Sequence, residues 1–258
     1  MNQKNSSMKK FTFLCLAILS AFFIGCQHKV SGGLNDALEE LNKEYEAQKK
    51  QNGEDSSLYN FVDKYKKLSQ QFEDSGELHK VIECEKKILE IYNQTWDEPT
   101  PKIAITQWYI GENYVNLKDC DSAESYLHKA IETATILKSN EKEPDSIDPN
   151  GRIISDSYRS LSFLFSENGE KEKAIEYLEN SIQYQPIEVD HDKYLYAVGL
   201  DFLASLYEGQ SRYSDAAKFY ENSLKIFERV FPDSTDWIND LQDALSRLKT
   251  RTDINNQK

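Results

Sequence analysis

One phrase occurs four times along this chain, and it constrains the fold more than any other feature. Each copy has two apolar segments at helical spacing, separated by a short polar break, and the second segment has a small residue near its start. The equivalent positions are Val81, Ala123, Ala174 and Ala216, which lie 42, 51 and 42 residues apart. Apolar segments in such pairs predict antiparallel helices. The sequence therefore predicts four helical hairpins with one insertion between the second and the third.

The residues around these positions are also arranged alike in the last three copies. A small residue in the first helix faces a small residue in the second, so that the two backbones can approach closely. Val81 is larger than its equivalents, so the first copy fits the pattern least well. The matching residues are Ile110, Gly111, Tyr114, Ala123, Leu127 and Ala130 in the second copy; Tyr158, Leu161, Ser162, Phe165, Ala174, Leu178, Ser181 and Pro186 in the third; and Leu203, Ala204, Tyr207, Ala216, Tyr220 and Ser223 in the fourth.

This pattern resembles the tetratricopeptide repeat (TPR). The resemblance implies an all-α, right-handed α-solenoid of about four helical hairpins, with a C-terminal capping helix. The 42-residue period is longer than the usual one of about 34 residues, and it is similar to the variant found in kinesin light chains. Stacked hairpins of this kind display a groove and seldom catalyse. We therefore expect a non-enzymatic protein that binds a protein or an extended peptide.

The repeat array is one of four segments that we expect along the chain. We expect a signal peptide over residues 1–25, a tether and short helix over 26–57, the repeat array over 58–231, and a capping helix with a polar tail over 232–258. In the last segment, apolar residues at helical spacing predict an amphipathic helix with a polar outer face. The expected hairpins cover residues 58–95, 102–138, 152–185 and 193–231.

The first 26 residues indicate where the protein acts. Three lysines precede an apolar run from Phe11 to Ile24, which has the length of a secretory signal and is short for a membrane span. The run ends in Gly25-Cys26, which resembles the lipobox of bacterial lipoproteins, although Phe23 stands where leucine is usual. The resemblance implies cleavage before Cys26, palmitate and diacylglycerol on that cysteine, and an outer-membrane anchor facing the periplasm or the cell surface. The alternative is an ordinary secretory signal.

The net charge limits the kinds of partner that the chain can bind, and the cysteines and histidines limit its possible disulfides and metal sites. The net charge is −13, and loss of the signal segment removes only lysines, so the remaining chain is still more acidic. Such a charge excludes nucleic acid and favours a partner with basic residues. Cys84 and Cys120 are expected to be free, with a disulfide between them as the alternative. The histidines are scattered, so the sequence predicts neither a metal nor a cofactor.

The groove of the expected solenoid is lined by one face of each first helix. On that face we expect Trp108 and Phe163 to form an apolar floor among carboxylates that pair with a basic peptide. The alternative is that both aromatic residues pack between neighbouring repeats. The lysine and asparagine clamp that holds a terminal carboxylate in other members is absent. The groove residues are Lys66, Gln70, Glu73, Trp108, Glu112, Arg159, Phe163, Asp201, Ser205 and Glu208.

Two short motifs remain. The insertion Ser139–Gly151 superficially resembles a calcium loop, but serines fall where carboxylate ligands are needed, so a turn-rich loop is expected. Asp121, Asp145 and Asp233 each begin a three-residue motif that resembles the O-glycosylation sequence of Bacteroidetes. Together with the lipobox, these motifs suggest a Bacteroidetes-like lipoprotein. The competing functions are capture of a small ligand or glycan at the cell envelope, which needs a deep pocket, and an enzyme, for which no catalytic constellation is present.

Overall fold

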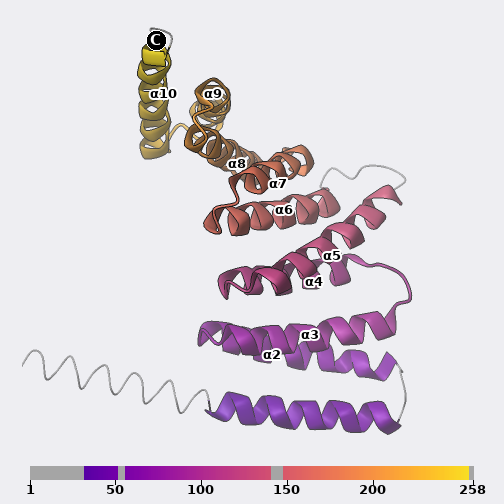
Figure 1. Ribbon diagram of the computed structural model, residues 1–258. Helices are drawn as coiled ribbons and strands as arrows, with labels where there is room; N and C mark the ends of the chain where they lie inside the picture. Colours follow the sequence, from indigo (N-terminus) through magenta and orange to yellow (C-terminus); the bar gives the residue numbers. More distant parts are fainter. Residues whose placement is uncertain (1–31, 52–55, 141–147, 256–258) are drawn as a thin grey trace, which may run out of the picture. The chain divides into compact units, whose positions relative to one another are not determined.

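The computed structural model of the chain describes residues 32–51, 56–140 and 148–255, and these form an all-helical array without strands (Figure 1). The chain separates into two compact units, the first ending at Thr95 and the second beginning at Trp96. The expected signal peptide (residues 1–25) and Cys26 lie outside the described residues. So does the centre of the insertion, residues 141–147.

The first unit holds the helix over residues 32–51 and the first hairpin. A short 3-10 helix, η1 (Ser56–Tyr59), leads into α2 (Asn60–Asp74), which is followed by α3 (Leu78–Thr95). Tyr45 on the helix 32–51 is fully buried and packs edge-on against Phe61 and Tyr65 of α2. Its hydroxyl donates to Glu90 of α3 at 3.1 Å. The helix that the sequence marked only as short is therefore part of the core of this unit.

The second unit consists of the other three hairpins and a last helix (Figure 1). Each hairpin packs internally, and each second helix also packs against the first helix of the next hairpin. The helices are α4 (Pro101–Asn116), α5 (Cys120–Ser139), α6 (Pro149–Glu167), α7 (Lys171–Tyr184), α8 (Asp190–Gly209), α9 (Tyr213–Val230) and α10 (Thr235–Asn255).

The hairpins turn in the same way because one residue in each turn adopts a left-handed conformation. These residues are Gly76, Lys118, Gly169 and Ser211, with φ between 59° and 80°. One residue later, the backbone N–H bonds to a carbonyl five residues back, which closes the end of each first helix. Glycine accepts positive φ without strain, so Gly76 and Gly169 fit the turn best.

Several helices begin where a side chain caps the backbone of the first turn. Thr100 accepts a hydrogen bond from the backbone of Ile103 at the start of α4, and Asp119 accepts one from Ser122 at the start of α5. Asp148 caps α6 by accepting from Gly151, with Pro149 in the first turn. Such caps accept hydrogen bonds from the backbone N–H groups of the first turn, which have no acceptor within the helix. The part of the insertion after residue 147 is thus the start of α6, not a ligand loop.

Small residues bring the paired helices together as expected. A Cβ added to Gly111 would lie 2.7 Å from the side chain of Leu127, which is too close for carbon atoms. The Ser162 hydroxyl donates to the backbone carbonyl of Ala174 at 2.7 Å. In the fourth hairpin, Ala204 and Ala216 are both fully buried. The register of the repeats is therefore the one derived from the sequence.

The last helix ends the array because its outer face is polar. Leu241, Ala244 and Leu248 of α10 are buried in the core that α9 shares. The 42-residue period places Ser246 and Lys249 at the positions that Ala204 and Tyr207 hold in the fourth hairpin. Both are exposed in α10, where no described second helix covers them. A terminal helix with a polar outer face is what an array needs to remain soluble.

Candidate binding surface

The expected groove residues fall into two sets, which belong to different units. Lys66, Gln70 and Glu73 lie exposed on α2 of the first unit. There the Gln70 amide donates to Glu73 at 3.1 Å. The other seven residues lie on the first helices α4, α6 and α8 of the second unit, and we call this surface the first-helix wall. Its members are Trp108, Glu112, Arg159, Phe163, Asp201, Ser205 and Glu208.

The repeat register divides the wall into rows. Trp108, Arg159 and Asp201 hold equivalent positions and are all partly buried. One helical turn later, Glu112 is partly buried, whereas its equivalents in α6 and α8 are exposed. The first row therefore lies closer to the core, and the second faces solvent more.

The two aromatic residues of the wall have different environments. Trp108 packs against apolar residues of α5 and α6, and its indole N–H is buried without a hydrogen-bond acceptor within the described part of the chain. Phe163 on α6 is 52% exposed. Trp108 packs between neighbouring repeats, and Phe163 is the apolar side chain that the wall presents to solvent.

The carboxylates beside Phe163 are held by neighbouring side chains. Ser160 of α6 donates to Glu112 of α4, and Arg159 donates to Asp156. Arg159 also donates to Gln185 at 3.3 Å. Burial raises the pKa of the Glu112 carboxyl, which the Ser160 hydrogen bond partly offsets. Burial likewise raises the pKa of Asp156, against the effect of Arg159. A cation that approached either carboxylate would therefore gain from an incompletely compensated charge.

On α8 the wall meets α10. Burial raises the pKa of Asp201, which accepts a hydrogen bond from Trp237 of α10 and lies near Asp240. Glu208 accepts from Tyr220 at 3.3 Å and pairs with Arg251 of α10 at 3.5 Å. Trp237 also stacks on Phe227 of α9, so it contacts both the apolar core and the wall. Ser205 is exposed and donates to the carbonyl of Phe202.

Sequence reasoning missed two polar features. Glu85 of α3 is buried, accepts a hydrogen bond from Ser69 at 2.7 Å, and has a pKa raised by burial. Its position is that of Leu127 in the next hairpin, so the repeat register could have exposed it. The second feature is the ion pair of Arg152 with the buried Asp192 at 2.6 Å, which links the first turns of α6 and α8. No local pattern marks this pair, because its members lie in different hairpins.

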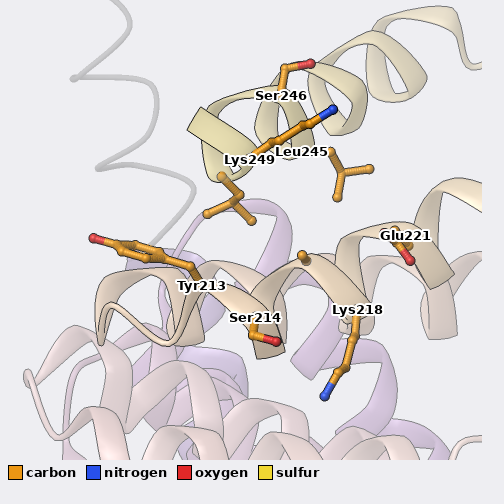
Figure 2. Close-up of a pocket in the computed structure, with 9 residues that line it drawn as sticks. Tyr213, Ser214, Lys218, Glu221, Leu245, Ser246 and Lys249 are labelled. Atoms are coloured by element: carbon orange, nitrogen blue, oxygen red, sulfur yellow. The ribbon is translucent and has the colours of Figure 1, made fainter. Parts of the chain in front are cut away.

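Surface recesses lie beside the hairpins in both units. Figure 2 shows the recess between α9 and α10, of about 580 Å³, with Tyr213 and Lys218 on one side and Leu245 and Lys249 on the other. A second recess of about 660 Å³ lies between α8 and α9. A third, of about 370 Å³, lies between α2 and the helix 32–51 in the first unit. All are open to solvent, as is typical of surfaces that bind protein segments.

Several kinds of site find no support in the described residues. No group of three potential metal ligands comes together there. Cys84 is a buried free thiol and Cys120 a partly exposed one. Burial raises the pKa of the Cys84 thiol to about 12, so it is a poor nucleophile. None of the described helices combines the length and apolar character needed to cross a bilayer.

Comparisons with known proteins agree with this geometry. Models of the tetratricopeptide repeat match residues 155–188 and 198–236. The chain contains tetratricopeptide repeats. No curated protein matches the sequence.

Solved structures of TPR proteins are similar in fold. One contains the nearly identical TPR-like repeats of a protein assigned as a kinesin light chain from Podosopora anserina, with 16% identity, coverage of 76% of this chain and 89% of that chain, and a TM-score of 0.55. Another is BtubC (BKLC) from P. vanneervenii, with 13% identity, coverage of 86% and 92%, and a TM-score of 0.54. The expected kinesin-light-chain-like TPR fold is therefore confirmed. TPR proteins generally bind other proteins and are typically non-enzymatic scaffolds.

Proposed function

We propose that this chain is a lipid-anchored scaffold of the bacterial cell envelope, and that its first-helix wall binds an extended protein segment with basic residues. The exposed Phe163 carries the proposal, because it is a large apolar side chain at the centre of a wall of charged groups. An aromatic anchor surrounded by polar residues is typical of a binding hot spot.

The charge of the wall favours a basic partner. Carboxylates on the wall, and beside it on α6, α8 and α10, outnumber the guanidinium groups there, and burial already raises the pKa of Glu112, Asp156 and Asp201. A bound lysine or arginine would stabilise their charged forms. The carboxylates are Glu112, Asp156, Asp192, Asp201, Glu208 and Asp240; the guanidinium groups are Arg152, Arg159, Arg247 and Arg251.

A photo-crosslinking residue at position 163 tests the location of the surface. We expect crosslinks from position 163 to one basic segment of an envelope protein. Ile136 of α5 is the matched control, because it is a similarly exposed apolar residue (41%) that lies on a second helix, away from the wall. Equal crosslinking from both positions would contradict the proposed surface.

Affinity for the crosslinked segment then separates the contributions of charge and burial. We expect Glu112→Gln to weaken binding most at low salt, since Coulomb attraction is screened at high salt. Phe163→Ala should weaken binding at every salt concentration. Binding that is indifferent to both changes would place the surface elsewhere.

Anchoring is supported by Cys26 at the end of the apolar run, and it is tested independently. Only a thiol at residue 26 can accept the diacylglycerol. We expect labelled palmitate to enter the wild-type chain but not Cys26→Ser, which should stay uncleaved or be released from the membrane. Equal labelling of the two would end the lipoprotein proposal while leaving the binding surface intact.

A further inference from the structure

The recess between α8 and α9 exists because the fourth hairpin has smaller side chains at one paired position. In the third hairpin this position is filled by Tyr158 and Tyr184, whose rings stack at 6.1 Å. The 42-residue period places Leu200 and Ile226 there in the fourth hairpin, and both line the recess of about 660 Å³.

The same position is closed in the other hairpins as well. In the second hairpin, Thr133 donates to Gln107 at 2.8 Å across it. In the first hairpin, Tyr65 and Ile91 are both fully buried there. The open recess is therefore particular to the fourth hairpin, and an aromatic ring is the kind of group that fills this position in the third.

The rim of the recess is cationic in an otherwise acidic chain. Asn222, Lys225 and Arg229 follow one another along one edge of α9, and all are exposed. Among the described residues, neither Lys225 nor Arg229 forms an ion pair. Glu228 also lines the recess and accepts a hydrogen bond from Gln242 of α10 at 3.4 Å, so the rim has two cations and one carboxylate.

The other charged groups of these helices are of both signs. The ion pairs of α8 and α9 join Lys193 to Asp190, Asp192 to Arg152, Arg212 and Lys218 to Asp215, and Glu208 to Arg251, whereas Asp201, Glu221 and Glu228 form no ion pair among the described residues. Two unpaired cations thus stand beside an apolar floor, in a chain whose net charge is −13. The rim is complementary to anionic groups, and the floor to an aromatic ring.

We propose that this recess binds an acidic peptide segment that places an aromatic side chain against Leu200 and Ile226 and carboxylates against Lys225 and Arg229. The inference goes beyond the proposed function, because it concerns a different face of the second unit and a partner of opposite charge. The chain would then hold two protein segments at once, a basic one on the first-helix wall and an acidic one here.

The test uses the full chain in neutral detergent and the rhodamine-labelled peptide Asp-Glu-Tyr-Glu-Asp, followed by fluorescence anisotropy. We expect saturable binding that weakens with salt. The peptides Asp-Glu-Ala-Glu-Asp and Lys-Lys-Tyr-Lys-Lys should bind at least about tenfold more weakly, because the first lacks the ring and the second has the wrong charge.

Two double variants probe the floor and the rim separately. Leu200→Tyr with Ile226→Tyr restores the residue pair of the third hairpin, so it should fill the recess and abolish binding while the chain stays folded. Lys225→Glu with Arg229→Glu should reduce binding by about tenfold or more. Lys218→Glu with Lys249→Glu is the matched control, because it changes the net charge equally but lies in the recess of Figure 2.

The outcomes decide the proposal. Loss of binding in the first two variants with retention in the control supports it. Equal loss in both charge variants would show attraction to the general surface, and it would overturn the proposal. So would the absence of binding by the wild-type chain, or full binding by the filled variant. None of these results depends on Cys26 or on Phe163. A failure of this proposal would therefore leave the proposed function untouched, and the two can be tested independently.

Discussion

The first and the third hairpins use the same serine in different ways. Ser69 of α2 and Ser162 of α6 hold equivalent positions, and both are buried. Ser162 donates to the backbone carbonyl of Ala174 at 2.7 Å. Ser69 donates instead to the carboxylate of Glu85 at 2.7 Å. Two residues near these serines differ between the hairpins: Ala174 of the third is Val81 in the first, and Leu178 of the third is Glu85 in the first.

This comparison shows what the small residues do. An alanine methyl lets the backbone of the second helix come within hydrogen-bond distance of the serine. A valine in its place adds two methyl groups, and the serine then bonds to a side chain. Both solutions satisfy the buried hydroxyl, as buried polar groups require. We conclude that the repeat fixes the helix positions, while the way in which the interface is filled differs from hairpin to hairpin.

The largest expected effect comes from removing the close approach in the third hairpin. Ala174→Leu places three more carbon atoms between α6 and α7, and we expect a loss of roughly 1–3 kcal/mol or more in the free energy of unfolding. Urea unfolding measures the loss, and hydrogen exchange should localise it to these two helices. An unchanged free energy would mean that the register of the repeats is wrong.

The converse change should also destabilise the chain. Val81→Ala brings the first hairpin closer to the family pattern, but its surroundings are built around the larger side chain. At about 0.8 kcal/mol for each buried carbon that is lost, we expect a loss of about 1.5 kcal/mol. Urea unfolding again provides the measurement. A gain in stability would show that alanine is favourable at this position whatever faces it.

Much of the fold could be predicted from the sequence, because the small residues and the period of the repeat are local signals. Two helices nevertheless begin earlier than expected: α6 at Pro149 and α8 at Asp190. The first turn of α6 is formed by the Asp148 cap, which lies in the segment expected to be a loop. For α8, Val189 makes no side-chain cap, so no local pattern marks its start.

The wall was harder to predict, because its side chains interact with helices that are distant in sequence. Register could have separated Trp108 from Phe163, since they hold different rows of the repeat. It could not have shown that Trp237 donates to Asp201, because that contact depends on how α10 packs. Local periodicity therefore identifies which residues lie on a face, but not which of them neighbouring elements cover.

The pH dependence of the first hairpin sharpens the comparison further. Glu85 stands where the third hairpin has Leu178, and burial raises its pKa above the ordinary value of 4.5. The folded chain therefore holds this proton more tightly than the unfolded chain, so stability falls as the pH rises from 4.5 through the folded-state pKa. We expect Glu85→Leu combined with Ser69→Ala, which removes both partners of the buried hydrogen bond, to stabilise the chain by roughly 1 kcal/mol at pH 8.

That gain should shrink toward pH 4.5, where the wild-type carboxyl is increasingly protonated. Urea unfolding at several pH values measures it. Glu132→Leu is the control, because Glu132 is an exposed carboxylate on α5, in another hairpin, and its replacement should show no such gain. A gain that was the same at every pH would mean that the apolar contact of the leucine, and not the removed charge, is responsible.

The smallest expected effect comes from the serine of the third hairpin itself. Ser162→Ala removes the hydroxyl that bonds to the carbonyl of Ala174, but the carbonyl still accepts an N–H of its own helix, so no buried acceptor loses its last partner. We expect a loss of only about 0.5 kcal/mol, measured by urea unfolding. Because alanine is smaller than serine, the close approach of α6 and α7 should persist, and hydrogen exchange in both helices should change little. A loss as large as that of Ala174→Leu would show that the hydrogen bond, and not the small volume at this position, holds the two helices together.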